Sequence, residues 1–178
     1  MRVLRRGGII AYPTEAVFGL GCDPSNATAV KRILHIKQRS PAKGFILIAA
    51  TLTHLEPFIE PLDMLSRTRV VATWPGPVTW LLPARNAPAW LRGCHDTLAV
   101  RVTAHPLAAT LCHAWGGPLV STSANLSGRL PARSALQVHR RLGNLVDYIV
   151  PGATAGATQP TEIRDLQSGR VVRGVNKA

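Results

Sequence analysis

The sequence of 178 residues lacks several features that would place it in a large class of proteins at once. Its apolar runs never exceed a handful of residues, far short of the roughly 20 that a membrane-spanning helix requires. It has three cysteines, widely spaced and without a CxxC pair, which argues against a disulfide framework. Its six histidines show neither HxH nor HExxH spacing. The sequence therefore predicts no metal site built by the protein.

Aromatic and acidic residues are also scarce. Aromatic residues make up 5% of the chain, which argues against nucleic-acid recognition dominated by base stacking. Nine Asp and Glu stand against 21 Lys and Arg, which gives a net charge of +12. Such an excess favours polyanionic partners. Because the basic residues are scattered along the chain, we expect folding to bring them together into one basic face.

The N-terminus and the length of the chain limit the possible localisation and the number of domains. The apolar stretch near the N-terminus is interrupted at Pro13, before it reaches the length of a signal peptide. The length suits one domain with a sizeable core and is short for two. We therefore expect a single domain over residues 1–178, located in the cytoplasm and without a membrane partner.

Apolar runs alternate with helical patterns along the chain. We expect strands over residues 8–12, 45–50, 78–82, 98–102, 118–120, 148–150 and 171–172. We expect helices from Asn26 to Ser40-Pro41 and over residues 51–58, 62–73, 105–115 and 133–143. Residues 83–93 and 151–160 are expected to form surface loops, the second of them mobile. The alternation predicts an α/β layered fold with a mixed sheet.

The first predicted strand ends beside two polar residues. Pro13 removes a backbone donor and should stop the strand, which places Thr14 and Glu15 at its end. Gly19 and Gly21 allow a tight turn or a close approach of backbone to a ligand. Two readings stay open at this point, because Glu15 can serve a binding site or can simply be solvated.

Basic side chains are concentrated in the stretch KQRSPAK. Residues two apart share a side in an extended segment and diverge on a helix. If Ser40-Pro41 pulls the stretch out of helical geometry, Lys37 and Arg39 converge on one anion. In that case we expect Lys37 to face a phosphate and to contribute little to packing. The alternative is that these residues only complement the negative end of the helix dipole.

The stretch STSAN offers neutral donors in a similar arrangement. If it stays extended, Ser121, Ser123 and Asn125 share one side and face what Lys37 and Arg39 face. The chain contains no GxxxxGK[ST] loop, so a bound nucleotide would not have its phosphates held by a Walker motif. The glycines near residue 20 do not complete a GxGxxG fingerprint either.

Together these segments resemble a known family. The segments AYPTEAVFGLGCDP, KxR with Lys43 following, WPGPVTW, LAVRV and STSANLSG occur in the order and spacing of the YrdC/TsaC family of threonylcarbamoyl-AMP synthases, in its short bacterial form. The resemblance implies a YrdC-like α/β domain with a twisted mixed β-sheet, flanked by helices, around a basic concave surface. It also implies synthesis of threonylcarbamoyl-adenylate and pyrophosphate from L-threonine, bicarbonate and ATP. In that family this is the first step towards threonylcarbamoyl-adenosine at position 37 of ANN-decoding tRNAs.

The resemblance further implies a set of site residues and partners. Lys37, Arg39, Ser123 and Asn125 correspond to the catalytic core. Substrate- or nucleotide-binding positions correspond to Thr14, Lys43, Thr79, Arg101, Ser121, Thr122 and Arg173. Mg²⁺ is expected to arrive with ATP. Further expected partners are tRNA or another RNA on the basic face, and proteins that receive the adenylate.

The chain departs from the family pattern at its N-terminus and at Gly44, and two other functions stay open. Relatives usually have a further helix before the first strand, so we expect either that the true start lies before Met1 or that this edge of the core is less covered. Gly44 stands where many relatives have proline, which should loosen that loop. The alternatives are an RNA-binding module without catalysis, and an enzyme that forms a carbamoyl-adenylate from carbamoyl phosphate.

Overall fold

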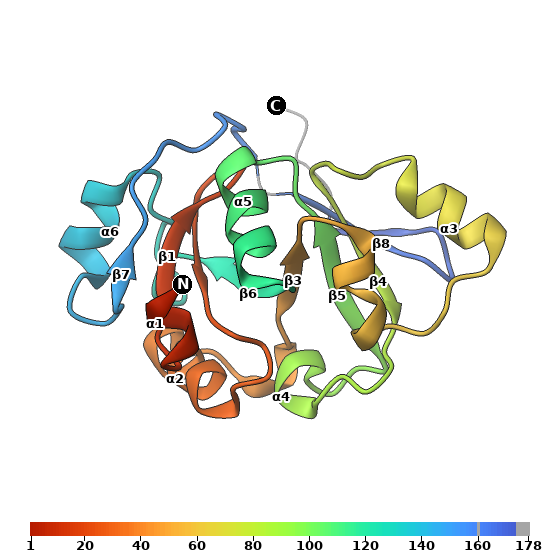
Figure 1. The fold of residues 1–178 in the computed structure, drawn as a ribbon, viewed down its shortest axis with the longest axis horizontal. Helices are drawn as coiled ribbons and strands as arrows, with labels where there is room; N and C mark the ends of the chain where they lie inside the picture. The colour runs from red at the N-terminus through yellow and green to blue at the C-terminus, as the bar shows by residue number, and fades with distance from the viewer. Residues whose placement is uncertain (160, 174–178) are drawn as a thin grey trace.

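One mixed β-sheet runs through the molecule (Figure 1). The computed structural model describes residues 1–159 and 161–173. Within these residues nine strands pair in the order β7-β1-β2-β6-β3-β5-β4-β8-β9. The strands are β1 (Ile10–Pro13), β2 (Phe18–Gly21), β3 (Ile46–Ala49), β4 (Val78–Pro83), β5 (Thr97–Val102), β6 (Leu119–Ser123), β7 (Tyr148–Ile149), β8 (Glu162–Asp165) and β9 (Val171–Arg173). Three neighbouring pairs are parallel, β1 with β7, β3 with β5 and β4 with β8. The predicted mixed α/β sheet is confirmed.

Helices flank this sheet. They are α1 (Arg2–Arg5), α2 (Ala27–Lys37), α3 (Met64–Val71), α4 (Ala89–Arg92), α5 (Pro106–Trp115) and α6 (Ala135–Leu142), with 3₁₀ turns η1 (Pro41–Lys43), η2 (Leu52–His54) and η3 (Glu56–Phe58). The predicted cap at Asn26 is confirmed, because its side chain accepts a hydrogen bond from the Ala29 backbone N–H at 3.0 Å. Among the described residues, no helix has the length and apolar character needed to cross a bilayer.

The two faces of the sheet carry different side chains. Successive side chains of a strand point to opposite faces, so the pairing register assigns each one. On the first face a large apolar core packs beneath α2, α4 and α6, with Leu47, Val100 and Val120 at its centre. On the second face a smaller apolar cluster lies beneath α1 and α5, which Figure 1 shows in front of the central strands. The smaller cluster comprises Leu4, Ile10, Tyr12, Ile48, Ala108, Cys112 and Leu119.

The rest of the second face is polar or open. Gly19 pairs with Ser123, and Ile46 pairs with Ser121, so these four positions share a face. Arg101 pairs with Ile48, which belongs to the smaller cluster, and therefore lies on that same face. The fold thus places a glycine, two serines and an arginine beside the apolar patch that α5 covers.

Strand β2 was not predicted. The interpretation of Gly19 and Gly21 as a turn is wrong, because both lie within β2 and pair with β1. A Cβ atom on Gly21 would lie 2.6 Å from the Val120 carbonyl oxygen and 2.7 Å from the Tyr12 ring. The glycine is therefore needed for the close approach of neighbouring groups inside the sheet, not for a turn.

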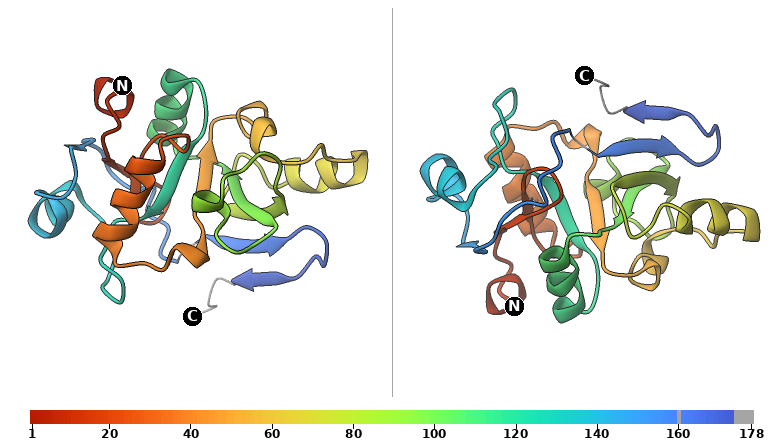
Figure 2. Two further views of the ribbon diagram at one scale, coloured as in Figure 1. Left: turned by 90° about the horizontal axis from the view of Figure 1, so that it is seen from below. Right: turned by 90° about the horizontal axis from the view of Figure 1, so that it is seen from above.

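Other element predictions were wrong in detail. Two 3₁₀ turns, η2 and η3, replace the helix expected over residues 51–58, and α4 interrupts the loop expected over residues 83–93. Strand β8 was not predicted; it pairs with β9, and both lie at one edge of the molecule in Figure 2. Strand β1 includes Pro13, one residue beyond the predicted end. These elements are short, so neighbouring strands and helices decide their geometry more than local sequence does.

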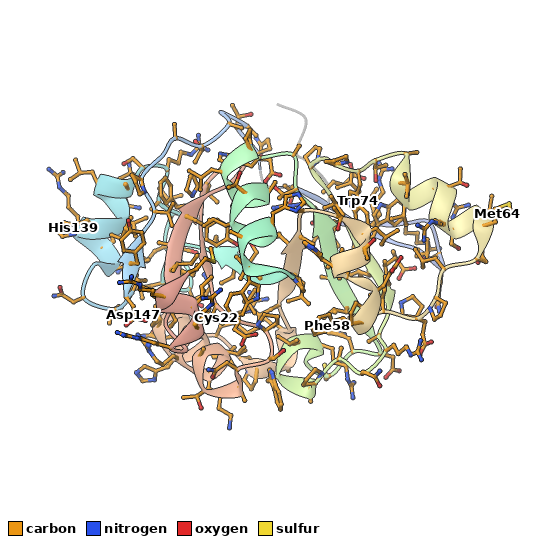
Figure 3. The ribbon with its side chains drawn as sticks, viewed as in Figure 1. Cys22, Phe58, Met64, Trp74, His139 and Asp147 are labelled. Atoms are coloured by element: carbon orange, nitrogen blue, oxygen red, sulfur yellow. The ribbon has the colours of Figure 1, made fainter. Side chains whose placement is uncertain are left out.

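The N-terminal edge is covered in spite of the short lead. Helix α1 buries Leu4 against the smaller cluster on the second face. The Ile9 backbone N–H donates to Asp147 at 2.6 Å, and Asp147 pairs with Arg32 at 3.0 Å. Asp147, labelled in Figure 3, therefore ties the start of β1 to α2 and to the segment before β7.

Candidate active site

A cavity of about 590 Å³ opens beside the polar part of the second face. It lies where the ends of β1, α2 and β6 meet the segment before α6 and the residues Thr158, Thr161 and Ile163. Its polar lining consists of Thr14, Gln137, Arg39, Arg101, Arg133, Arg141, Ser121, Thr122, Ser123, Thr158 and Thr161. None of the described lining residues is Asp or Glu, so the cavity is suited to an anionic ligand.

Six of the predicted site residues line this cavity: Thr14, Arg39, Arg101, Ser121, Thr122 and Ser123. Lys37, Lys43, Thr79 and Asn125 are not among its lining residues. Lys43 lies exposed in η1, and Asn125 lines a neighbouring cavity of about 530 Å³. Arg173 belongs to β9, but its side chain is outside the part of the chain that the structure describes.

The end of α2 determines where Lys37 and Arg39 lie. Gln38 adopts the left-handed conformation with φ 50 and ψ 46. The backbone N–H groups of Gln38 and Arg39 donate to His35 and Leu34 respectively, which is the Schellman arrangement of a helix end. The helix therefore ends by a left-handed turn at Gln38, and the predicted stop at Ser40-Pro41 is wrong. Ser40 instead caps η1.

Lys37 is held by internal oxygens. Its side chain is buried, and Nζ donates to the Ser123 backbone oxygen at 2.6 Å and to the Asn125 backbone oxygen at 3.0 Å. Nζ also lies 2.8 Å from Asn125 Oδ1 and 3.4 Å from Ser123 Oγ. The expectation that Lys37 contributes little to packing is wrong. Burial and the nearby Arg39 guanidinium lower the pKa of Lys37 to about 8.

These contacts join the KQRSPAK motif to the STSAN motif. Ser121 and Ser123 share a face, as predicted, because both belong to β6. Asn125 lies beyond the end of that strand, and its amide nitrogen donates to the Arg129 backbone oxygen at 2.6 Å. Ser123 Oγ donates to Asn125 Oδ1 at 2.6 Å. Asn125 thus lines the neighbouring cavity and connects to the main one through Ser123.

Arg39 is partly buried beside the cavity. One Nη atom donates to the Gly44 backbone oxygen at 3.0 Å, and the guanidinium lies 5.8 Å from the centre of the Phe45 ring. Burial lowers its pKa, although a guanidinium stays protonated at any ordinary pH. Gly44 has φ 58 and is buried against the backbone of Arg92, so a proline at this position would not fit.

Glu15 and Arg101 form a buried ion pair. Arg101 Nη2 lies 3.1 Å from Glu15 Oε2, and both side chains are less than one-tenth exposed. Burial alone would raise the pKa of Glu15, but Arg101 and the Thr103 hydroxyl outweigh it and lower that pKa. The reading of Glu15 as a solvated residue is therefore wrong. Nothing in the sequence indicated this pair, because Glu15 lies in the turn between β1 and β2 and Arg101 lies far along the chain in β5.

Several buried polar atoms at this site have no hydrogen-bond partner among the described residues. They are Nε of Arg39, Nε of Arg101 and Oγ1 of Thr79. Thr79 lies on β4 beside Ile163, and Ile163 lines the cavity. A buried polar group without a partner costs about 1–3 kcal/mol, and native proteins retain few of them without a functional reason. This concentration of free donors marks the cavity as a binding site.

Residues 150–159, which follow β7, contribute Thr158 to the cavity lining. In Figure 1 this segment crosses from the β7 side of the molecule to the β8 side. The Ala155 backbone N–H donates to the Thr14 backbone oxygen at 3.2 Å, and the Ala157 backbone N–H donates to the Glu15 backbone oxygen at 3.0 Å. His105 Nε2 lies 3.0 Å from the Ala153 oxygen. The segment expected to be a mobile loop is therefore anchored along the PTE motif.

Sequence reasoning missed the basic residues supplied by α6 and the segment before it. Arg133 and Arg141 line the cavity, and they donate to the Thr158 and Leu130 backbone oxygens at 3.0 Å each. Gln137 also lines the cavity and accepts from the Arg133 backbone N–H. The only signal in the sequence was the spacing of Arg133, Gln137 and Arg141 by four; Gln137 and Arg141 lie on one face of α6, and Arg133 lies just before the helix.

The sequence of this chain matches a known protein family over nearly its whole length. Residues 2–174 match the sequence pattern of Sua5/YciO/YrdC, which carries the description "Telomere recombination". The chain belongs to the Sua5/YciO/YrdC family. The predicted resemblance is therefore confirmed at the level of the family.

Two relatives in this family are named threonylcarbamoyl-AMP synthase. One, from Nitrosococcus oceani, is 59% identical over 173 residues, which cover 97% of this chain and 94% of the relative. The other, from Halorhodospira halophila, is 56% identical over 171 residues, which cover 96% of this chain and 90% of the relative.

A solved structure in the family has the same fold. P. abyssi Sua5, complexed with L-threonine, superposes with a TM-score of 0.91 at 30% identity. The match covers 98% of this chain and 52% of the Sua5 chain, so this chain spans about half the length of that protein. The YrdC-like α/β fold predicted from the sequence is confirmed.

Proposed function

We propose that this protein makes L-threonylcarbamoyl-adenylate from L-threonine, bicarbonate and ATP and releases pyrophosphate. The two relatives named threonylcarbamoyl-AMP synthase support the reaction, since the identity with each exceeds 50% over nearly the whole chain. The observation in this structure that carries the proposal is the group of buried donors without partners, set in an arginine-lined cavity. Such a cavity suits a substrate with several negative charges.

The chemistry requires charge neutralisation more than a protein nucleophile. The threonine amine and bicarbonate give a carbamate and water. A carbamate oxygen then forms a bond to the α-phosphorus of ATP, and the bond from that phosphorus to the bridging oxygen of pyrophosphate breaks. Both partners are anionic, so fixed cations that hold them together and stabilise the charge of the transition state are what the catalyst must supply.

We assign the roles of the site residues on this basis. Arg39 supplies the positive charge that faces the phosphates, and Lys37 fixes the Ser123 and Asn125 oxygens while adding its own charge nearby. Ser121 and Ser123 present hydroxyls on the same face of β6 as the cavity. We propose that Arg101, Thr79 and Thr14 hold the amino acid, and that Thr122, Lys43 and Arg173 are further nucleotide-binding residues.

Magnesium belongs to the substrate in this proposal. Across the described residues no group of three or more His, Cys, Asp or Glu side chains could hold a metal ion. The lining contains hydroxyls but no carboxylate, which does not fit a resident Mg²⁺ site. We therefore propose that Mg²⁺ enters bound to the phosphates of ATP.

The net charge of +12 and the proposed adenylate product indicate further binding partners. We propose that tRNA or another RNA binds the basic face electrostatically, that acceptor proteins take the adenylate onward to tRNA, and that the work takes place in the cytoplasm. Affinity for RNA should fall along a straight line in a plot of log affinity against log salt.

One experiment tests the function. The purified protein is incubated with L-threonine, bicarbonate and Mg·ATP, and with each omitted in turn, and the products are analysed by mass. We expect threonylcarbamoyl-adenylate only in the complete mixture. Salt-sensitive RNA binding without any nucleotide turnover would instead support the RNA-binding module. Formation of a carbamoyl-adenylate when carbamoyl phosphate replaces threonine and bicarbonate would support the other enzyme.

A further inference from the structure

Glu15 is a buried carboxylate that touches the site without lining it. One oxygen, Oε2, lies 3.1 Å from Arg101 Nη2. The other, Oε1, accepts from the Thr103 hydroxyl at 2.7 Å and from the Ala104 backbone N–H at 3.3 Å. The Thr103 and Ala104 contacts fix the orientation of the Glu15 carboxylate. Glu15 therefore contacts the cavity through Arg101, which lines it.

The pair gives two arginines of the cavity different charge surroundings. Arg101 is neutralised by Glu15, whereas Arg39 forms no ion pair with a carboxylate among the described residues and has Lys37 as a neighbour. The surroundings of Arg39 are therefore strongly positive. The pair of Glu15 and Arg101 carries no net charge, but Arg101 still offers an unpartnered Nε–H donor. A polyphosphate is attracted to Arg39, and a zwitterionic amino acid is accommodated beside the neutral pair.

We propose that Glu15 is a positioning residue that fixes the Arg101 guanidinium for the carboxylate of the amino-acid substrate and keeps the triphosphate away from that guanidinium. The inference rests on the proposed function, because it takes an amino acid and ATP as the two ligands. Five N–H groups in a rigid plane are useful for recognition only when that plane is held in one orientation. Glu15 supplies this constraint through the contacts that Thr103 and Ala104 make with it.

The test uses steady-state kinetics with L-threonine and ATP varied separately. Glu15→Gln keeps the shape of the side chain and removes its charge. We expect KM for L-threonine to rise about ten- to a hundredfold, because small misplacements of a binding group cost that much, while KM for ATP stays within about twofold. Glu15→Asp keeps the charge and should recover part of the threonine KM. The matched control is Glu56→Gln, which removes a carboxylate from an exposed ion pair with Arg67 and should change neither constant.

A double-mutant cycle shows whether Glu15 acts through Arg101. Arg101→Met, Glu15→Gln and the double variant are compared for KM of L-threonine, with melting temperature as the check on folding. If the proposal holds, the double variant is no worse than Arg101→Met alone, because Glu15 has nothing left to orient. Additive effects, or a rise in KM for ATP in place of threonine, would overturn the proposal.

Failure of this inference and failure of the proposed function give different results. If the parent makes no adenylate from the complete mixture, the proposed function fails. If the parent is active and Glu15→Gln retains the parental threonine KM, only the role of Glu15 fails. Should Glu15→Gln not fold, Glu15→Asp decides alone, since an unchanged KM for threonine in that variant refutes the need for a fixed orientation of Arg101.

Discussion

The two faces of the sheet show how one set of strands serves both stability and binding. The first face carries the larger apolar core, which lies beneath α2, α4 and α6. The second face is apolar only where α1 and α5 cover it, and it carries Arg101, Ser121 and Ser123 where the cavity opens. Since successive side chains alternate between faces, Val100 and Val120 stabilise the core while their direct neighbours Arg101 and Ser121 line the cavity. The same short strands therefore fix the geometry of the site.

Removal of Lys37 should have the largest effect on activity and stability. This residue is buried among hydrogen-bond acceptors, and we also propose that its charge takes part in catalysis. In Lys37→Ala we expect the rate of pyrophosphate release to fall about 10²–10³-fold, as for loss of one group that stabilises transition-state charge. We also expect a lower melting temperature, since the oxygens of Ser123 and Asn125 lose their buried donor at about 1–3 kcal/mol. Steady-state kinetics and thermal melting measure the two effects.

The matched control is Lys31→Ala, on the exposed side of the same helix. It should change neither the rate nor the melting temperature. Parental activity in Lys37→Ala would refute the role proposed for this lysine and would weaken the one proposed for Arg39.

A change on the first face should separate stability from binding. Leu47 is fully buried in the larger core. Leu47→Ala should lower the free energy of unfolding by about 2–5 kcal/mol, because it leaves a cavity in a packed core. KM for threonine and ATP, measured well below the melting temperature, should stay within about twofold of the parent. A large change in either KM would mean that the two faces are not independent.

The pH dependence should show the smallest of the three effects. The pKa of Lys37 is lowered to about 8, so the ammonium is charged below that pH and neutral above it. If catalysis needs the charge, kcat/KM for ATP falls above about pH 8, by about tenfold for each further pH unit. Lys37→Arg should lack this fall because a guanidinium stays charged. An unchanged alkaline limb in Lys37→Arg would assign the titration to another group.

The sequence predicted much of the fold and six of the eleven polar residues that line the cavity. Continuous apolar runs marked the central strands at 45–50 and 98–102, and Asn26 marked the start of α2. Short motifs located Arg39, Ser123 and Arg101 at the cavity. The missed elements, β2, α4 and β8, are four residues long each, and such lengths carry too little periodicity to be recognised.

By itself the sequence determined which residue types are present and in what order, and with them the apolar cores, the basic charge and the motifs that place the chain in its family. Only the tertiary structure decided which of those residues meet. It turned Lys37 inward onto Ser123 and Asn125, placed Glu15 behind Arg101, and brought Arg133 and Arg141 to the cavity from α6 and the segment before it. The physical reason is that each of these contacts joins segments far apart in the chain. A contact of that kind depends on strand register and on the angle at which a helix ends, and local sequence specifies neither.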